Sequence, residues 1–296
     1  MTPKKRLNIL LADDGSQHAQ AAVELLLELP LPSKSSILIL RAFNSGQIPS
    51  IPEFERSLER SKSQLVGRGF RVETELKLGS AAQMILEHAE VKKPDLIVLG
   101  AKGLRSTMSI LLGGVAQQVM EYAPCPVLIV RAPCRGLQKI LLATDGSPSS
   151  LSAARYLCKF PLPPKVQVHV MHVLPPAEVP LLMEPQFGTW HTIYTMVPTR
   201  EEGHAAHARE TKHGEALLAR TCNLLRRNGI DPISKLARGD AATEIMDYVK
   251  SEQIDLIVAG SRGLSNLKGL WTGSVTRKLV HYSDCSVLLV KGPGKE

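Results

Sequence analysis

The sequence is poor in aromatic residues, in cysteine and in long apolar runs, and each shortage excludes a class of protein. Aromatic residues make up only 4% of the 296 residues, so aliphatic side chains must form most of the core. The five cysteines include no C-x-x-C pair, which argues against a zinc ribbon or a disulfide framework and predicts a reducing, cytoplasmic location. No apolar run approaches the roughly 20 residues of a membrane-spanning helix, so we expect no membrane span. The N-terminal apolar run ends at two aspartates, so we expect no signal peptide.

The chain also has no concentrated patch of one charge. Lys and Arg number 36 against 28 for Asp and Glu, and the excess is spread over both halves. The densest basic run covers only residues 4–6. This distribution indicates a solvated surface with a mild preference for anions, and it does not favour a nucleic-acid groove.

Common catalytic and metal-binding motifs are missing as well. The chain contains no G-x-S-x-G, no Walker P-loop and no G-x-G-x-x-G. Five residues that could ligate a metal lie on or near one expected helix: Glu201, His204, His207, Glu210 and His213. The H-E-x-x-H pattern is absent, so solvated helix residues are the preferred interpretation. We therefore predict no catalytic residue and no metal site, and a protein that binds rather than catalyses.

What the chain does contain is two copies of one pattern. Residues 10–16, LLADDGS, return as residues 141–147, LLATDGS, at an offset of 131. Residues 94–100, PDLIVLG, return as residues 254–260, IDLIVAG, at an offset of 160. We therefore predict a tandem duplication whose second copy carries an insertion of 29 residues.

The duplication divides the chain into two predicted domains, residues 1–133 and 134–296, with the insertion between about residues 174 and 211. In each copy, apolar runs typical of buried strands alternate with amphipathic segments typical of helices. In the first copy we expect strands at residues 6–12, 36–42, 71–78, 96–100 and 127–131 and helices at residues 19–29, 53–68, 81–92 and 112–122. Strict alternation predicts an α/β fold in which each domain is a five-stranded parallel sheet with helices on both faces.

Ligands of open parallel sheets bind beyond the carboxyl ends of the strands, at the point where the strand order reverses. The first strand of the second copy ends at Asp145, whose carboxylate could accept hydrogen bonds from a ribose or a base, and Asp14 occupies the same place in the first copy. Each fourth strand runs into a Gly-x-x-Gly turn, which is followed nine residues later by another glycine. The ends of the first and fourth strands are therefore the candidate binding site of each copy.

In the second copy the glycine spacing has a physical logic. Gly260 and Gly263 allow a tight turn and a close backbone approach. Gly273 and Ser274 begin a helix whose free N–H groups and positive dipole end favour a phosphate, and Arg262 supplies charge nearby. Turn and capping glycines alone would explain one such pattern, but its occurrence in both copies favours a binding site.

The combination of G-x-x-G-x9-G-[S/T] after the fourth strand with T-D-G-S after the first strand resembles the universal stress protein family. The resemblance covers nearly the whole chain apart from the insertion. It implies two tandem flavodoxin-like domains of the HUP, or adenine nucleotide alpha hydrolase-like, type and a protein that binds ATP together with Mg²⁺. Asp145 and the backbone of Val173 would then hold the adenosine, and the loop glycines and Ser274 would hold the phosphates and the ribose.

The first copy departs from the family pattern because Gly114 replaces the Ser or Thr. The missing hydroxyl removes a hydrogen bond worth about 0.5–1.5 kcal/mol, so a site here would be weaker without being abolished. The other aligned candidates are Asp14, Ala42, Gly100, Gly103 and Gly113. The sequence leaves open whether this copy is occupied.

The final strands, residues 127–131 and 287–291, would each be exposed at a sheet edge unless they are paired. In the universal stress protein family these edges pair between subunits, so the resemblance implies that they pair within this chain as a pseudo-two-fold dimer. A further homodimer of chains is compatible with this arrangement. The implied function is a nucleotide-dependent stress-response regulator that acts on unidentified protein partners. Two alternatives are a slow ATPase, or phosphoryl or nucleotidyl transferase, and a nucleotide-free interaction scaffold.

Overall fold

The structure is a computed structural model that describes residues 6–103, 112–176, 200–262 and 273–292. The first repeat consists of β1 (Asn8–Ala12), α1 (Gln17–Glu28), β2 (Ser36–Phe43), the 3-10 helix η1 (Ser45–Ser50), α2 (Ile51–Gly67), β3 (Arg71–Leu78), α3 (Ala81–Lys92), β4 (Leu96–Gly100), α4 (Gly114–Tyr122) and β5 (Val127–Val130). The second consists of β6 (Lys139–Ala143), α5 (Pro148–Leu157), β7 (Gln167–Leu174), α6 (Arg200–Arg226), β8 (Pro232–Arg238), α7 (Ala241–Glu252), β9 (Leu256–Gly260), α8 (Ser274–Tyr282) and β10 (Ser286–Val290). The predicted βα alternation is confirmed in both repeats.

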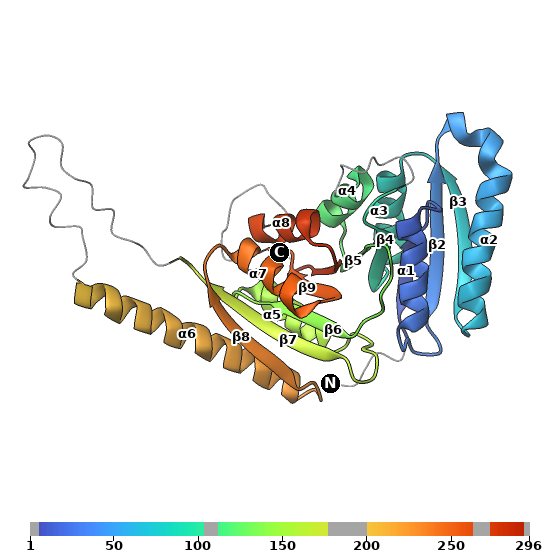
Figure 1. The fold of residues 1–296 in the computed structure, drawn as a ribbon. Coiled ribbons are helices and arrows are strands. Elements are labelled where there is room, and N and C mark those ends of the chain that lie inside the picture. Colours follow the sequence, from blue (N-terminus) through green and yellow to red (C-terminus); the bar gives the residue numbers. More distant parts are fainter. Residues whose placement is uncertain (1–5, 104–111, 177–199, 263–272, 293–296) are drawn as a thin grey trace, which may run out of the picture.

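All these strands belong to one sheet, in the order β3-β2-β1-β4-β5-β10-β9-β6-β7-β8 (Figure 1). Within each repeat the neighbouring strands are parallel. The two repeats meet at an antiparallel pair, β5 with β10, in which Leu128 lies opposite Leu288. This pairing confirms the expectation that the final strands join within the chain. Because β10 runs antiparallel to β5, the strands of the two repeats point in opposite directions. Their carboxyl ends therefore lie at opposite ends of the sheet along the strand direction.

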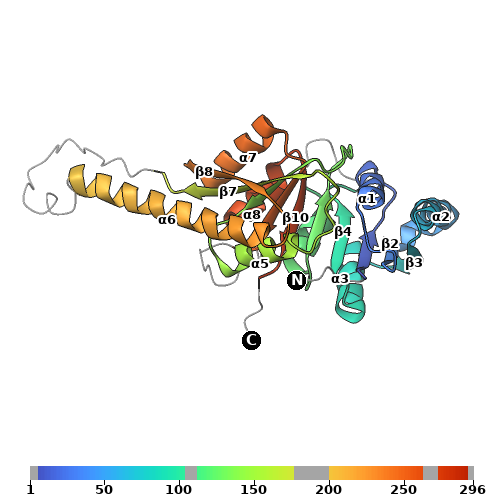
Figure 2. The ribbon, with the colours of Figure 1, turned by 90° about the horizontal axis from the view of Figure 1, so that it is seen from below.

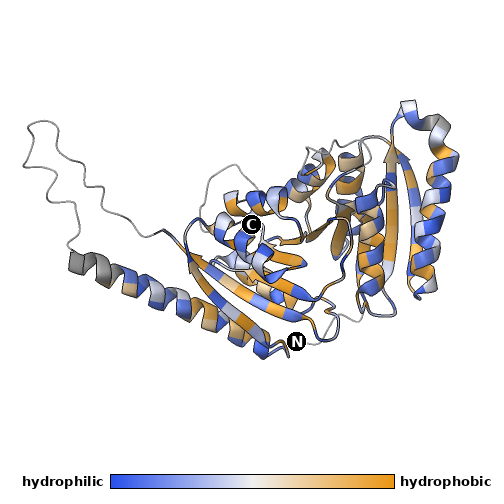
Figure 3. Ribbon diagram, in the orientation of Figure 1, coloured by the Kyte–Doolittle hydropathy of each residue, from blue (hydrophilic) through white to orange (hydrophobic). Residues whose placement is uncertain are grey.

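Helices cover both faces of this sheet. One core layer contains buried residues of α1, α2, α5 and α6, and the other contains buried residues of α3, α4, α7 and α8. Alternating strand residues divide between the layers, so that Leu11 packs in the first and Leu10 in the second. Figure 3 shows hydrophobic residues concentrated on the strands and hydrophilic residues along the outer helices α2 and α6. Both layers continue across the β5–β10 junction, so the two repeats share each core layer.

Within the described part of the chain, the repeats differ most visibly in the length of the helix between their second and third strands. Helix α2 has 17 residues and α6 has 27. Figures 1 and 2 show α6 extending past the ends of β7 and β8. Part of the predicted insertion therefore lengthens this helix, whereas residues 177–199 lie outside the described part of the chain.

Local hydrogen bonds fix where the helices begin. The Oγ atoms of Ser16 and Ser147 accept hydrogen bonds from Ala19 N and Ser150 N, so α1 and α5 begin directly after these N-caps. The expectation that a helix starts at residue 112 was wrong, because α4 begins at Gly114, after Gly113 has taken an extended backbone conformation. No helix among the described residues has the length and apolar character needed to cross a membrane.

Candidate functional site

A crevice of about 270 Å³ opens at the carboxyl ends of β6 and β9, beside α7 and α8. The sequence candidates of the second repeat that line it are Asp145, Val173, Gly260, Arg262, Gly273 and Ser274. Gly263, the remaining candidate, lies outside the described residues. The fold thus brings together four separate segments: Asp145, Val173, residues 260–262 and residues 273–274.

The first repeat forms a matching crevice of about 310 Å³ at the opposite edge of the sheet. The sequence candidates that line it are Asp14, Ala42, Gly100, Gly103, Gly113 and Gly114. The duplication therefore produces two crevices of similar size from aligned residues.

The two aspartates are held by their own loops. Asp14 Oδ1 accepts a hydrogen bond from Ser16 N (3.0 Å), and Asp145 Oδ1 accepts one from Ser147 N (2.9 Å). The intervening glycines, Gly15 and Gly146, have φ of +78° and +80°, a conformation that favours glycine. One carboxylate oxygen of each aspartate is thus used to shape the turn, and this contact orients the carboxylate at the crevice.

The same loops are tied to the loops that follow the fourth strands. Ser16 Oγ donates to Lys102 O (3.1 Å), and Ser147 Oγ donates to Arg262 O (3.4 Å). Each serine also caps a helix, α1 or α5. These hydrogen bonds join the loop that follows the first strand to the loop that follows the fourth strand in each repeat.

The glycines that end β4 and β9 are required by helix packing. A Cβ atom on Gly100 would lie 2.7 Å from His18 Cβ in α1, and one on Gly260 would lie 2.6 Å from the backbone carbon of Ser149 in α5. A Cβ on Gly103 would meet Asp14 Oδ2 at 2.6 Å. Close packing within the protein therefore explains these glycines, and Gly100 and Gly260 offer only backbone atoms to the crevices.

The beginnings of α4 and α8 face the crevices without a side-chain cap. Their N-cap residues are Gly113 and Gly273, and no side chain among the described residues caps either helix, whereas serines cap α1 and α5. The first N–H groups of a helix have no partner within the helix, and the helix dipole makes this end positive. An anion is therefore favoured at both sites, with Lys102 or Arg262 lining the same crevice.

An apolar wall lies across each crevice, and sequence reasoning did not assign it to the site. In the second repeat its residues include Met171, Ala241, Ile245 and Val275, and the equivalents in the first are Leu40, Ala81, Ile85 and Val115. The signal for it was the matched small residues 81–82 and 241–242 at the start of α3 and α7. An apolar wall of this kind can pack against a planar ring.

Sequence reasoning also missed Arg41, a buried cation behind the first crevice. Its Nη2 donates to Asp14 O (2.6 Å), and its guanidinium carbon lies 4.1 Å from the centre of the Phe54 ring. Burial lowers the pKa of Arg41, and the charges of Asp13 and Asp14 oppose that shift. Asp13 is itself buried, with Oδ2 accepting a hydrogen bond from Ser61 Oγ (2.7 Å). A lone arginine in an apolar strand was the available signal.

The histidines and glutamates of α6 whose side chains are described do not gather into a ligand set. Glu210 forms an ion pair with Arg238 (2.7 Å), which attaches α6 to β8. Among the residues that the structure describes, no group of three or more His, Cys, Asp or Glu side chains could hold a metal ion. The side chains of Glu201 and His204 are not among those described.

The fold and the crevices define a tandem α/β protein with a crevice at the strand ends of each repeat. The universal stress protein family model matches residues 5–131 and again residues 136–291, so the chain belongs to this family. This match also confirms the tandem resemblance.

Individual relatives agree with this assignment. Universal stress protein YxiE of Bacillus subtilis is 31% identical over 157 residues, which cover 52% of this chain and 98% of that protein. A universal stress protein of Methanocaldococcus jannaschii is 29% identical over 159 residues, covering 54% of this chain and 85% of that protein. The crystal structure of a universal stress protein from Archaeoglobus fulgidus has the same fold over 98% of both chains, with a TM-score of 0.66 at 18% identity.

Proposed function

We propose that this protein binds ATP, accompanied by Mg²⁺, in the crevice of the second repeat and acts as a nucleotide-dependent stress-response regulator. The observation that carries the proposal is that one crevice combines an uncapped helix N-terminus, a cation, an aspartate and an apolar wall. These groups match the parts of a nucleoside triphosphate, namely the phosphates, the ribose and the base.

The phosphates are assigned to the end of the crevice formed by α8. Ser274, the first residue of α8, and Arg262 both line the crevice, so the first backbone N–H groups of α8, the Ser274 hydroxyl and the Arg262 guanidinium are the groups available to the phosphates. Hydrogen bonds to charged groups are worth about 1.5–3 kcal/mol each, roughly twice the value of neutral ones. Several such donors in one place favour a polyanion over a neutral ligand.

The adenosine is assigned to the side formed by β6, β7 and α7. Asp145 would accept hydrogen bonds from the ribose, and the backbone of Val173 would contact the base. The apolar side chains of Met171 and Ile245 would pack against the planar ring. Buried apolar contact stabilises a bound ring by about 25 cal/mol per Å².

The crevice of the first repeat is proposed as a weaker site of the same kind. It retains the helix N-terminus, the aspartate and the wall, and Lys102 takes the place of Arg262. Gly114 offers no hydroxyl, so affinity should be lower than in the second repeat by the value of about one hydrogen bond.

Regulation requires that ATP bind two conformations of the protein with different affinity.

We further propose that the protein works in a reducing compartment, the cytoplasm, since all five cysteines are free thiols.

The test is to denature the purified protein and quantify the released nucleotide per chain by chromatography. Ser274→Asp and Gly114→Asp form a matched pair, because each places a carboxylate at the first residue of the phosphate-facing helix, where an acidic side chain is compatible with the helix but repels phosphate. We expect about one ATP per chain, lost in Ser274→Asp and kept in Gly114→Asp.

Other outcomes separate the alternatives. Release of ADP, with turnover of added ATP that Ser274→Asp abolishes, would indicate an ATPase. Absence of nucleotide, together with no rise in melting temperature on adding Mg-ATP, would contradict the proposal and favour the interaction scaffold.

A further inference from the structure

Lys291 directly follows β10 in the second repeat, yet its amine reaches the first repeat. Its Nζ donates to Met120 O and to Glu121 O, both at 2.9 Å. These carbonyls belong to the last turn of α4, the helix whose first residues line the crevice of the first repeat. A residue of one repeat thus holds the far end of the other repeat's phosphate-facing helix.

Arg131 makes the reciprocal contact. It directly follows β5 in the first repeat, and its Nη2 donates to Val280 O (2.7 Å) and His281 O (3.3 Å) in the last turn of α8. Its backbone N donates to Ser286 Oγ (3.2 Å) at the start of β10, which fixes it at the junction of the repeats. The offset of 160 that aligns the repeats relates Arg131 to Lys291 and also relates the two pairs of carbonyls.

Such contacts act on a whole helix. The last carbonyls of a helix have no partner within it, and a cation placed there complements the negative end of the helix dipole. Helices α4 and α8 have nine residues each, so their two ends are only about 13 Å apart. A short, packed helix moves as one body, and the position of its last turn therefore sets the position of its first N–H groups.

We propose that Lys291 and Arg131 are positioning residues for nucleotide binding that act crosswise: Lys291 positions α4 for the crevice of the first repeat, and Arg131 positions α8 for the crevice of the second. Each crevice is then completed by a residue of the other half of the chain. This inference rests on the proposed function, because it names residues that support the proposed sites without touching the ligand.

The crosswise arrangement distinguishes a positioning role from a contact that only stabilises the interface between the repeats. Removing a contact of the second kind would lower the ligand affinity of both crevices to the same extent. A residue that serves its own repeat would weaken the crevice of that repeat. The proposal instead expects loss only in the opposite repeat.

The experiment measures Mg-ATP affinity by calorimetry in full-length protein with one crevice blocked. Gly114→Asp leaves only the second crevice, and Ser274→Asp leaves only the first. We expect Lys291→Met to weaken the first crevice about three- to tenfold and to change the second less than twofold, with Arg131→Met giving the reverse. Lys291→Arg should restore binding, and Lys250→Met, at an exposed lysine of α7, is the matched control.

Amide hydrogen exchange in the absence of nucleotide provides the second readout. Lys291→Met should increase exchange in residues 117–122 of α4 and leave residues 277–282 of α8 unchanged, and Arg131→Met should do the opposite. Equal effects in both helices, or effects in the variant's own repeat, would overturn the proposal. If the wild type bound no Mg-ATP, the proposed function would fail. The exchange pattern would still decide whether Lys291 and Arg131 each stabilise the helix of the opposite repeat.

Discussion

The two repeats hold the same turn with different side chains. In the first repeat, Arg41 lies behind Gly15, with its Nη1 3.1 Å from the position a Cβ atom would take. In the second, Leu217 of α6 fills the corresponding space behind Gly146, and His172 Nδ1 donates to Thr144 O (2.8 Å). The repeats therefore differ in charge behind the crevice while the turn itself has φ of +78° and +80°.

The features that both repeats share are the ones on which the shape of the crevice depends. The backbone of the turn, the aspartate at its start and the serine cap are the same in both repeats. The residues behind them have changed from a charged cluster to a mostly apolar contact. The same backbone geometry at the crevice is thus maintained by two different sets of side chains. Exchanging single residues between the two sets should lower the free energy of unfolding.

The largest effect is expected from Asp13→Thr, which gives the first repeat the residue of the second. It removes the acceptor of Ser61 and the carboxylate beside the buried Arg41, whose side chain then keeps its charge with less compensation. The free energy of unfolding should fall by about 3 kcal/mol in urea titrations. Adding Arg41→His should recover part of the loss. If the stability losses of Asp13→Thr and Arg41→His simply added up in the double variant, the idea that the two residues form one unit would be contradicted.

A somewhat smaller loss is expected from Gly100→Ala, because the new methyl group would lie 2.7 Å from His18 Cβ. Overpacking of this kind costs about 1–3 kcal/mol. Gly114→Ala is the control, since nothing lies within 4 Å of its Cβ position. Urea unfolding that showed equal stability for the two variants would contradict the packing explanation for the glycine.

A smaller effect is expected from exchanging the first residues of α4 and α8. Gly114→Ser should raise the Mg-ATP affinity of the first crevice by about two- to tenfold, and Ser274→Gly should lower that of the second by a similar factor, through one hydroxyl donor. Calorimetry with the opposite crevice blocked measures both. Failure of Gly114→Ser to strengthen binding would show that the repeats differ in more than this hydroxyl.

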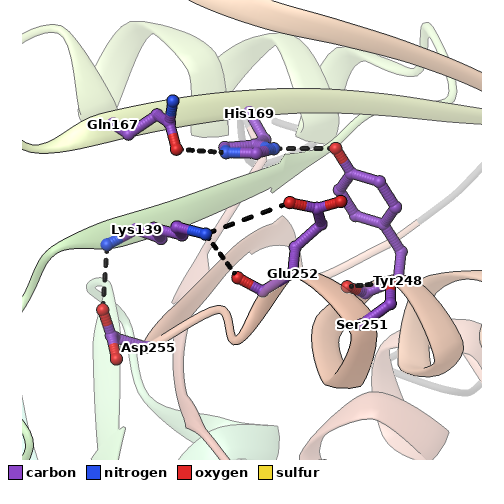
Figure 4. Close-up of polar contacts among 7 residues, drawn as sticks. All are labelled: Lys139, Gln167, His169, Tyr248, Ser251, Glu252 and Asp255. Carbon is purple, nitrogen blue, oxygen red and sulfur yellow. Dashed lines mark hydrogen bonds and ion pairs between the residues drawn. The ribbon is translucent and has the colours of Figure 1, made fainter.

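The smallest effect concerns pH and a polar cluster around His169 of the second repeat, at whose position the first repeat has Leu38 (Figure 4). His169 is 2% exposed, between Tyr248 Oη at 2.7 Å from Nδ1 and Gln167 Oε1 at 3.1 Å from Nε2. Burial lowers the pKa of His169 below its usual value of 6.5, with a smaller contribution from Lys139 and an opposing one from Glu252.

The unfolded chain therefore binds a proton more readily than the folded one, and stability is lost as the pH falls below about 6.5. His169→Leu, which gives the residue found at Leu38 in the first repeat, should reduce this loss. Urea midpoints measured from pH 8 to pH 5 for both proteins provide the check, and parallel curves would contradict it.

Much of the fold could be predicted because the duplication is strong in the sequence. Residues 71–78, 81–92 and 96–100 were expected as strand, helix and strand, and they are β3, α3 and β4. The loop residues of the crevices followed from one rule about strand ends together with the aligned glycines, whereas the apolar wall did not. The start of α4 was placed two residues early because apolar periodicity does not reveal that Gly113 takes an extended conformation.

The features that the sequence could not predict depend on contacts between the two repeats or between separate elements of one repeat. Arg131 and Lys291 both follow an apolar final strand, but their targets are defined only once β5 and β10 pair antiparallel. Arg41 appears as a lone charge in a strand, and its function depends on Asp13 and Phe54, which come from different elements. These contacts join distant segments, and one sequence contains no local pattern for them.

The antiparallel β5–β10 pair has a consequence for how the protein responds to its own concentration. When this edge joins separate subunits, dilution separates them, and the number of paired crevices falls with the protein concentration. Here a covalent chain joins the pair, so dilution cannot remove one half from the other. The two crevices are always present in a ratio of one to one, so under the proposed function any response to nucleotide would be independent of the protein's own abundance.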